Sequence, residues 1–183
     1  AIVRQTQGAL SGALDARRAA ASAARSAGLK EREAMLTTNL GFALTTIGAR
    51  QEARSALESG FSLADAIGSP AAVRHAQMNL LGWAATFGND RGLDAHLAET
   101  RADADAAASG VWAAPDRANL GALFYRGWEL LRGKGDAVCA RSRALLRFCA
   151  ETYRVTGNND VLPVALAVWA EAERRAHNLE RAQ

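Results

Sequence analysis

Apolar residues recur every three to four positions along most of the chain, and glycines interrupt this pattern at regular intervals. The glycines that fall about twenty residues apart are Gly8, Gly28, Gly48, Gly68 and Gly88, followed by Gly110, Gly135 and Gly157. An apolar period near 3.6 marks one buried face of a helix, and glycine suits the left-handed position just beyond a helix end. The pattern therefore predicts one helix in each interval.

Eight helices are predicted in this way. The fourth has the clearest start, because Ser69 suits the N-cap and Pro70 the first helical position. The predicted helices cover about 9–27, 30–47, 49–67 and 70–87, a stretch after Asn89-Asp90 that reaches Ala108, one from Pro115 to Gly133, one that begins at Asp136, and one from about 160–163 to Ala176.

Asn-Leu pairs recur at an interval of forty residues, at Asn39-Leu40, Asn79-Leu80 and Asn119-Leu120. Such a period indicates stacked structural repeats, here one antiparallel helical hairpin for each forty residues. We therefore expect a single repeat array over 1–183. Its hairpins would cover 29–68, 69–110 and 111–157, with partial units at 1–28 and 158–183.

Glycines also fall inside the first helix of each hairpin, at Gly41, at Gly82 and at either Gly121 or Gly127. Glycine inside a helix costs roughly 0.5–1 kcal/mol relative to alanine, so its recurrence indicates a close helix contact. The third hairpin has two competing registers, and the pattern does not choose between them. Large residues are expected to fill the core around these contacts: Leu40, Leu44, Leu57, Leu63, Leu80, Phe87, Leu97, Leu123, Leu145 and Phe148.

Composition supports an all-α fold. Of 183 residues, 49% are hydrophobic but only 6% are aromatic, and nearly a quarter are alanine, the best helix former. No alternating β-branched run predicts a strand, and no long apolar run predicts a membrane span. The 22 basic and 19 acidic residues are interspersed. This disfavours a nucleic-acid surface, which needs clustered basic residues.

Candidate chemistry is sparse. Cys139 and Cys149 lie on one predicted helix, too far apart to form a disulfide, and are interpreted as buried small hydrophobes. His75, His96 and His177 are dispersed, and Asp103 and Asp105 would point to different sides of a helix. No phosphate loop, zinc motif or nucleophile motif occurs. We therefore expect no enzyme activity, metal or cofactor in this segment.

The stretch Asn39-Leu40-Gly41-Phe42-Ala43-Leu44-Thr45-Thr46-Ile47-Gly48, followed by Ala53 and Leu57, resembles a tetratricopeptide repeat. Gly41, Gly48 and Ala53 match three small-residue positions of that family. Asn79 to Gly88 and Arg126 to Gly133 resemble a version one residue shorter, and His177 to Ala182 resembles the turn and opening of a further second helix. The period near forty is longer than the family's standard 34 residues.

The resemblance implies a right-handed superhelical stack of antiparallel hairpins, in which the first helices line a concave groove that binds a protein or peptide. It also implies a non-catalytic interaction or regulatory module of a larger bacterial, cytoplasmic signalling protein, attached to a kinase, ATPase, cyclase or DNA-binding domain. The alternative is a sensor domain whose groove binds a small molecule or short peptide. We expect no nucleic-acid partner and no membrane association.

Candidate partner-binding residues lie on the predicted first helices. Asn39, Asn79 and Asn119 form a ladder that could contact a peptide, although an identical residue in every repeat better suits bonding between neighbouring helices. Departures from the repeat are the better recognition candidates: Phe42, Thr46, Trp83 and Trp128. These four have a core-packing alternative, because aromatic residues at helical spacing usually pack.

The C-terminal end carries a further expectation. Leu179 to Ala182 would open a second helix whose continuation lies beyond Gln183, so we expect the chain to be a segment of a longer protein. Apolar residues of the last predicted helix would then lack a cover: Val164, Leu166, Val168 and Trp169. We expect self-association through this end, or its coverage by the following helix of the intact protein.

Overall fold

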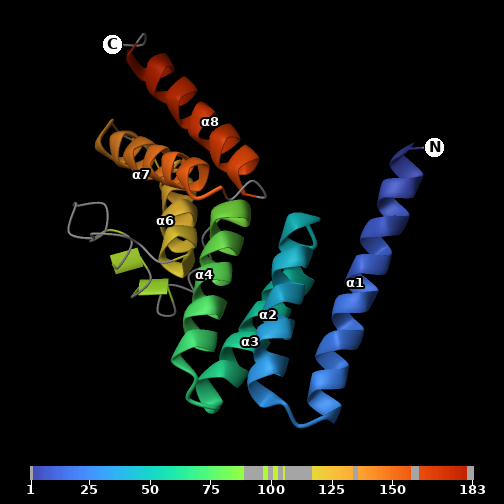
Figure 1. Ribbon diagram of the computed structural model, residues 1–183. Helices are drawn as coiled ribbons and strands as arrows, with labels where there is room; N and C mark the ends of the chain where they lie inside the picture. Colours follow the sequence, from blue (N-terminus) through green and yellow to red (C-terminus); the bar gives the residue numbers. More distant parts are fainter. Residues whose placement is uncertain are drawn as a thin grey trace. The chain divides into compact units, whose positions relative to one another are not determined.

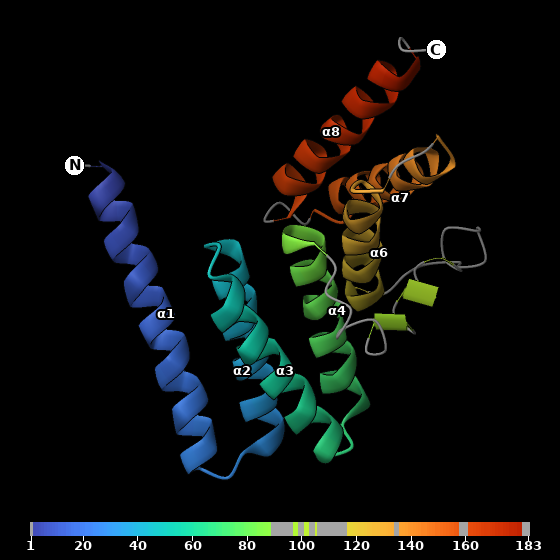
Figure 2. The same cartoon turned by 180° about the vertical axis from the view of Figure 1, so that it is seen from behind.

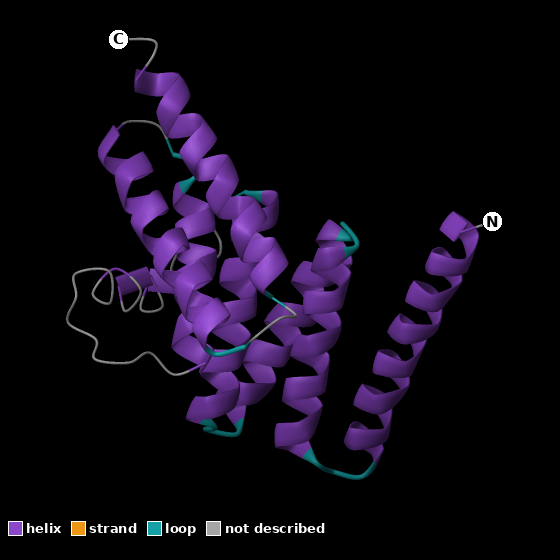
Figure 3. Ribbon diagram, turned by 45° about the horizontal axis from the view of Figure 1, so that its top comes forward, coloured by secondary structure: helices purple, strands orange, loops and turns teal. Residues whose placement is uncertain are grey.

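The fold is all-α throughout the described part of the chain. The computed structural model describes residues 2–88, 97–98, 101–102, 105, 117–133, 136–157 and 161–180. Within these ranges every regular element is an α-helix and none is a strand (Figure 3). The helices, labelled in Figure 1, are α1 (Ile2–Ser26), α2 (Lys30–Thr46), α3 (Arg50–Ala66), α4 (Pro70–Phe87), α6 (Arg117–Leu130), α7 (Asp136–Val155) and α8 (Leu162–Glu180).

The chain divides into two compact units, which are described separately below. The first is Ala1–Trp83 and the second is Ala84–Gln183, so the division falls inside α4. No helix of the described ranges is long and apolar enough to cross a membrane. The predicted fifth helix lies mostly outside the described residues, although Leu97, Arg101 and Asp105 have helical conformation.

Three turns of the first unit repeat one another at the predicted interval. Gly28, Gly48 and Gly68 have φ of 69°, 82° and 64°, respectively. In each turn the residue after the glycine donates its N–H to a carbonyl five positions earlier, as in Ala49 N to Leu44 O at 3.0 Å. This is the Schellman arrangement, which satisfies the last carbonyls of the preceding helix. The predicted breaks at these glycines are confirmed, as are those at Gly88 and Gly157, whose φ values are 95° and 68°.

The two ends of the helical sequence differ from the prediction. Helix α1 begins at Ile2 and passes through Gly8 and Gly12, so glycine spacing alone does not end a helix. Helix α8 continues through His177 to Glu180, so the turn predicted at 177–178 is wrong. Alanine, arginine and glutamate dominate that stretch and favour continued helix over a turn. The predicted break at Gly110 lies outside the described residues.

In the first unit, α2 and α3 form a hairpin whose helices meet at one glycine from each side. A Cβ atom at Gly41 would lie 2.6 Å from Leu57 Cγ. Conversely, a Cβ atom at Gly60 of α3 would collide with Thr38 Oγ1 of α2. Both glycines are buried, and Leu57 is fully buried. These absent side chains allow the helices to approach closely, which explains why the helical cost of glycine is tolerated.

Helix α4 joins this hairpin through small residues. Ala34, Ala64 and Ala72, one from each of α2, α3 and α4, are almost completely buried against one another, with Leu63 and Val73 packed beside them. Alanine leaves helices thin enough to pack with little side-chain volume between them. Alanine residues therefore form much of the contact between the helices in this part of the unit.

In the second unit, α6 and α7 are neighbouring helices that form a hairpin (Figure 2). This hairpin also has a close contact at a glycine. A Cβ atom at Gly127 would lie 2.9 Å from Leu146 Cγ. Four residues before that leucine, the fully buried Ser142 donates its hydroxyl to Gly127 O at 2.7 Å. In the first hairpin the equivalent position, four residues before Leu57, is Ala53. Of the two competing registers, the structure gives this contact to Gly127.

The core of the second unit includes side chains from α6, α7 and α8. Its buried residues are Leu120, Leu123, Phe124, Leu131, Leu145, Leu146, Cys149, Ala150, Tyr153, Ala165 and Ala172. Phe124 has its ring centroid 5.8 Å from that of Trp128 and 6.4 Å from that of Tyr153. The predicted core position of Phe148 is wrong, because that side chain is 42% exposed. The buried face of α7 is formed instead by Leu145, Cys149 and Tyr153.

Candidate functional site

The candidate residues of α2 lie on one stripe of that helix. Glu31, Met35, Asn39, Phe42 and Thr46 are spaced by four, four, three and four residues, which places them on the same side of an α-helix. We call this set the α2 stripe. Two of its residues make contacts in this direction: Asn39 contacts α4, and Glu31 contacts Ser69, the residue just before α4.

The first contact is a polar group formed by Asn39 of α2 and two residues of α4. His75 Nε2 lies 2.9 Å from Asn39 Oδ1, and it donates to that oxygen in the tautomer with the proton on Nε2. Asn79 donates from Nδ2 to His75 O at 2.8 Å. Burial lowers the pKa of His75, which keeps the ring neutral at pH 7. Asn39 therefore links neighbouring helices, as the packing interpretation of the asparagine ladder expects, while Asn79 bonds within its own helix.

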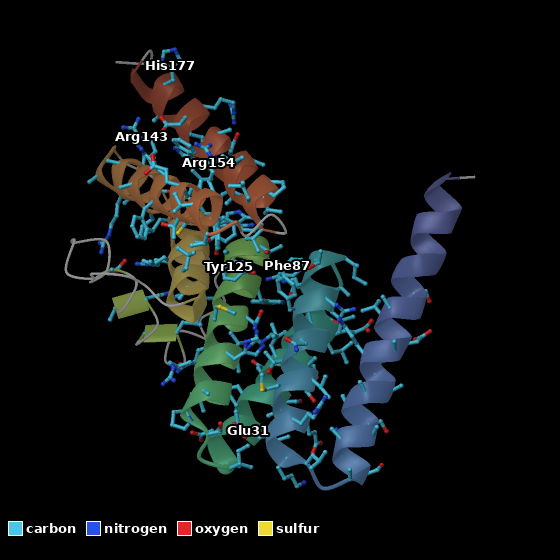
Figure 4. All side chains as sticks on the ribbon, viewed as in Figure 1. Glu31, Phe87, Tyr125, Arg143, Arg154 and His177 are labelled. Atoms are coloured by element: carbon cyan, nitrogen blue, oxygen red, sulfur yellow. The ribbon has the colours of Figure 1, made fainter. Side chains whose placement is uncertain are left out.

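The second contact is at the start of both helices. Ser69 donates its hydroxyl to Glu31 Oε1 at 2.6 Å and also accepts the N–H of Ala72 at 3.4 Å. The predicted N-cap at Ser69 is confirmed by the second bond. Figure 4 shows Glu31 near the beginning of α2. Together with the Asn39–His75 contact, this fixes which side of α2 faces α4.

Two apolar side chains on the α2 stripe remain open to solvent. Met35 is 42% exposed and Phe42 is 43% exposed, on either side of the half-buried Asn39. Thr46 is also exposed, and its hydroxyl donates to Phe42 O at 3.1 Å within the helix. This side of α2 therefore presents apolar surface around a polar pair, an arrangement suited to contact with another molecule.

Trp83 occupies a different environment. It is only 1% exposed, and its indole Nε1 donates to Arg50 O at 2.9 Å. The guanidinium carbons of Arg50 and Arg54 lie 5.6 Å and 5.7 Å from the ring centroid. These contacts join α4 to α3 and favour the packing interpretation of Trp83. The burial leaves little of the side chain for a partner.

The remaining candidates belong to the second unit. Asn119 lies in the first turn of α6, and its side chain is outside the described residues. Trp128, near the end of α6, is half-buried and packs beside Phe124. The structure therefore links Asn39 with Asn79 through His75, and it places Phe42 and Thr46 on the same side of α2 as Asn39.

A charged network occupies another part of the second unit. Arg126 binds Asp105 with Nε to Oδ1 at 3.1 Å and Nη2 to Oδ2 at 3.2 Å, and its Nη1 reaches Glu129 Oε2 at 2.7 Å. Arg101 and Arg141 complete the network at Glu129 and Asp105. Asp105 is thus engaged by arginines, whereas its predicted neighbour Asp103 lies outside the described residues. These ion pairs connect α6 and α7 with residues 101 and 105.

The described ranges show neither a cluster of metal ligands nor an exposed cysteine. They contain no group of three or more His, Cys, Asp or Glu residues placed to hold a metal ion. Cys139 and Cys149 are free and buried, and burial raises the pKa of the Cys149 thiol. A buried neutral thiol is a poor nucleophile.

The sequence interpretation missed two residues of this face. Met35 lies seven residues before Phe42, so helical spacing could have placed them together. His75 is one of three dispersed histidines in the sequence, and no local pattern pairs it with Asn39, thirty-six residues earlier.

No protein-family model, curated protein or solved structure matches the chain. The tetratricopeptide resemblance therefore rests on the residue pattern alone.

Proposed function

We propose that this chain is a non-catalytic protein-interaction or regulatory module, and that the α2 stripe is its partner-binding surface. The observation that carries the proposal is the exposure of Met35 and Phe42 on the side of α2 where Asn39 meets His75 of α4. The repeated turns and the glycine contacts of two hairpins support a tetratricopeptide-like stack, in which first helices such as α2 and α4 bind partners. We propose further that the module belongs to a larger bacterial signalling protein, as the resemblance implies.

The surface suits an apolar segment of a protein. Two large apolar side chains supply area that becomes buried on binding, at about 25 cal/mol per Å². The Asn39–His75 pair between them offers polar atoms that fix the register of a bound backbone. Because His75 is neutral at pH 7, this surface does not require an acidic partner.

The proposal is tested by quantitative pull-down from a bacterial lysate with the chain as bait. Phe42→Asp and Met35→Asp place a charge on the proposed surface without filling the hairpin core. Val155→Asp is the matched control, because it makes the same kind of change at an 86% exposed apolar residue of α7. Circular dichroism confirms that each variant is folded.

We expect a protein retained by the wild type and by Val155→Asp to be depleted by at least about tenfold with Phe42→Asp, since a buried unpaired charge is costly at an interface. Equal retention by all variants would contradict the assignment of the surface to the α2 stripe.

A further inference from the structure

A cleft of about 630 Å³ lies between the end of α6 and the middle of α8 in the second unit. Trp128, Leu131, Ala167 and Val168 supply its apolar lining, and Arg132, Glu171 and Arg175 its charged groups. This volume falls within the usual range for a small-molecule site, roughly 300–1,000 Å³. Polar surface slightly exceeds apolar surface in this lining, which suits a ligand that carries a charge as well as an apolar body.

Arg132 is a fixed cation at the edge of the cleft. Its Nε donates to Ala85 O at 2.8 Å, and its Nη2 donates to Thr86 O. These carbonyls belong to the last turn of α4, where a positive charge is favoured. Within the described part of the chain, Nη1 of Arg132 has no hydrogen-bond acceptor and the guanidinium has no carboxylate partner. The side chain is therefore anchored while part of its donor capacity remains open.

Arg175 is anchored in a similar way on the opposite helix. It donates from Nη1 to Leu131 O at 2.7 Å and from Nε to Glu171 Oε1 at 2.7 Å. Glu171 also binds Arg174, and these hydrogen bonds lower the pKa of Glu171 to about 2. Glu171 is therefore ionised at neutral pH. Two arginines against one glutamate leave the cleft with one excess positive charge.

We propose that this cleft binds a small amphipathic anion, a carboxylate attached to a flat apolar body. The carboxylate would accept hydrogen bonds from the open donors of Arg132, and the apolar body would lie against Trp128 and the side chains of α8. Charge complementarity selects an anion, and the excess of a single charge favours a monoanion over a polyanion. This site is distinct from the α2 stripe, so either assignment can fail without the other.

The test uses 2-naphthoate and its neutral analogue 2-naphthamide, which share the same ring system. Binding to the full chain is followed by isothermal titration calorimetry and by the NMR signal of the Trp128 indole N–H, assigned with Trp128→Phe. We expect 2-naphthoate to shift the Trp128 signal and to bind at least about tenfold more tightly than 2-naphthamide, as a charge-assisted hydrogen bond requires.

Three variants separate the site from general effects. Arg132→Gln should weaken 2-naphthoate binding by about tenfold or more and reduce the preference over the amide. Ala167→Phe, at an exposed position that lines the cleft, should abolish binding by filling it while leaving both arginines in place. Arg147→Gln, at an exposed residue of α7 paired with Glu151, should leave binding unchanged.

Ala167→Phe decides the test if Arg132→Gln proves unstable. Equal binding of the acid and the amide, undiminished binding to Ala167→Phe, or no shift of the Trp128 signal would overturn the proposal. Absence of 2-naphthoate binding together with a dimer in sedimentation that Ala167→Phe dissociates would also overturn it, and would assign the cleft to a second copy of the chain.

Discussion

Leu57 of α3 occupies the space that a side chain at position 41 of α2 would need. A Cβ atom at Gly41 would lie 2.6 Å from Leu57 Cγ, 2.8 Å from Leu57 Cδ2 and 3.0 Å from Leu57 N. Because the last of these atoms is backbone, a rotamer change of Leu57 cannot remove all the contacts. The fully buried leucine and the absent side chain together set how closely the two helices of this hairpin approach.

Gly41→Ala should destabilise the chain even though alanine is the better helix former. The clash with Leu57 forces a shift of packed residues, for which overpacking costs of about 1–3 kcal/mol are typical. Gly41→Leu should cost more. Urea melts followed by circular dichroism measure the change in the free energy of unfolding.

The matched control is Gly12→Ala in α1, where nothing lies within 4 Å of the added Cβ atom. That position is exposed and helical, so the substitution should stabilise its helix by up to about 1 kcal/mol. If Gly41→Ala and Gly12→Ala changed stability in the same direction, the contact between α2 and α3 would be misplaced.

Gly48→Ala should be destabilising for a different reason. Its Cβ atom would meet nothing within 4 Å, but φ at this position is +82°. A side chain in the left-handed region costs about 1–2 kcal/mol, and asparagine tolerates that region better than alanine. Thermal or urea unfolding should therefore rank Gly48→Asn between the wild type and Gly48→Ala, and a neutral Gly48→Ala would argue against the Schellman turn.

Stability should fall with decreasing pH because of His75. Burial lowers its pKa in the folded chain below the ordinary value of 6.5, so the unfolded chain binds the proton more readily. The contribution of neutral His75 is fully present above the unfolded pKa. It is lost as the pH falls from about 6.5 towards the lower folded pKa.

Urea melts between about pH 5.5 and 7.5, just below and above the ordinary histidine pKa, measure this slope. His75→Gln keeps hydrogen-bonding capacity but does not titrate, so it should reduce the slope in that window. An unchanged slope in the variant would show that other groups cause the pH dependence.

Ser142→Ala should cost about 1 kcal/mol, because it removes the buried hydroxyl that donates to Gly127 O. Ser55→Ala on the exposed side of α3 is the control and should change stability by less than about 0.5 kcal/mol. Similar effects of the two substitutions would indicate that the bond between α7 and α6 contributes nothing.

Local physics explains what was predictable from the sequence. Gly28, Gly48 and Gly68 end helices because the left-handed position penalises other residues, and this signal needs no tertiary information. The close contact at Gly41 was also predictable, since a mid-helix glycine has a recurring cost. The all-α class follows from the same local preferences.

Contacts between elements far apart in the chain were not predictable in the same way. The bond between Asn39 and His75 depends on how α2 faces α4, and the burial of Trp83 depends on Arg50 of α3. The two registers of the third hairpin differed only by which glycine meets α7, and packing against Leu146 decides for Gly127. The core position predicted for Phe148 is wrong because the side of α7 that carries Leu145 and Cys149 packs into the core. The apolar residues of α7 alone do not specify this orientation.

The central claim is that, within each of two hairpins, the two helices contact each other at a glycine. Nuclear Overhauser spectroscopy of the isotope-labelled chain tests this directly. Cross-peaks are predicted from the Hα protons of Gly41 to the δ-methyl protons of Leu57, and from those of Gly127 to Leu146. Assigned spectra that lack both cross-peaks, or that connect Gly121 instead of Gly127 to Leu146, would contradict it.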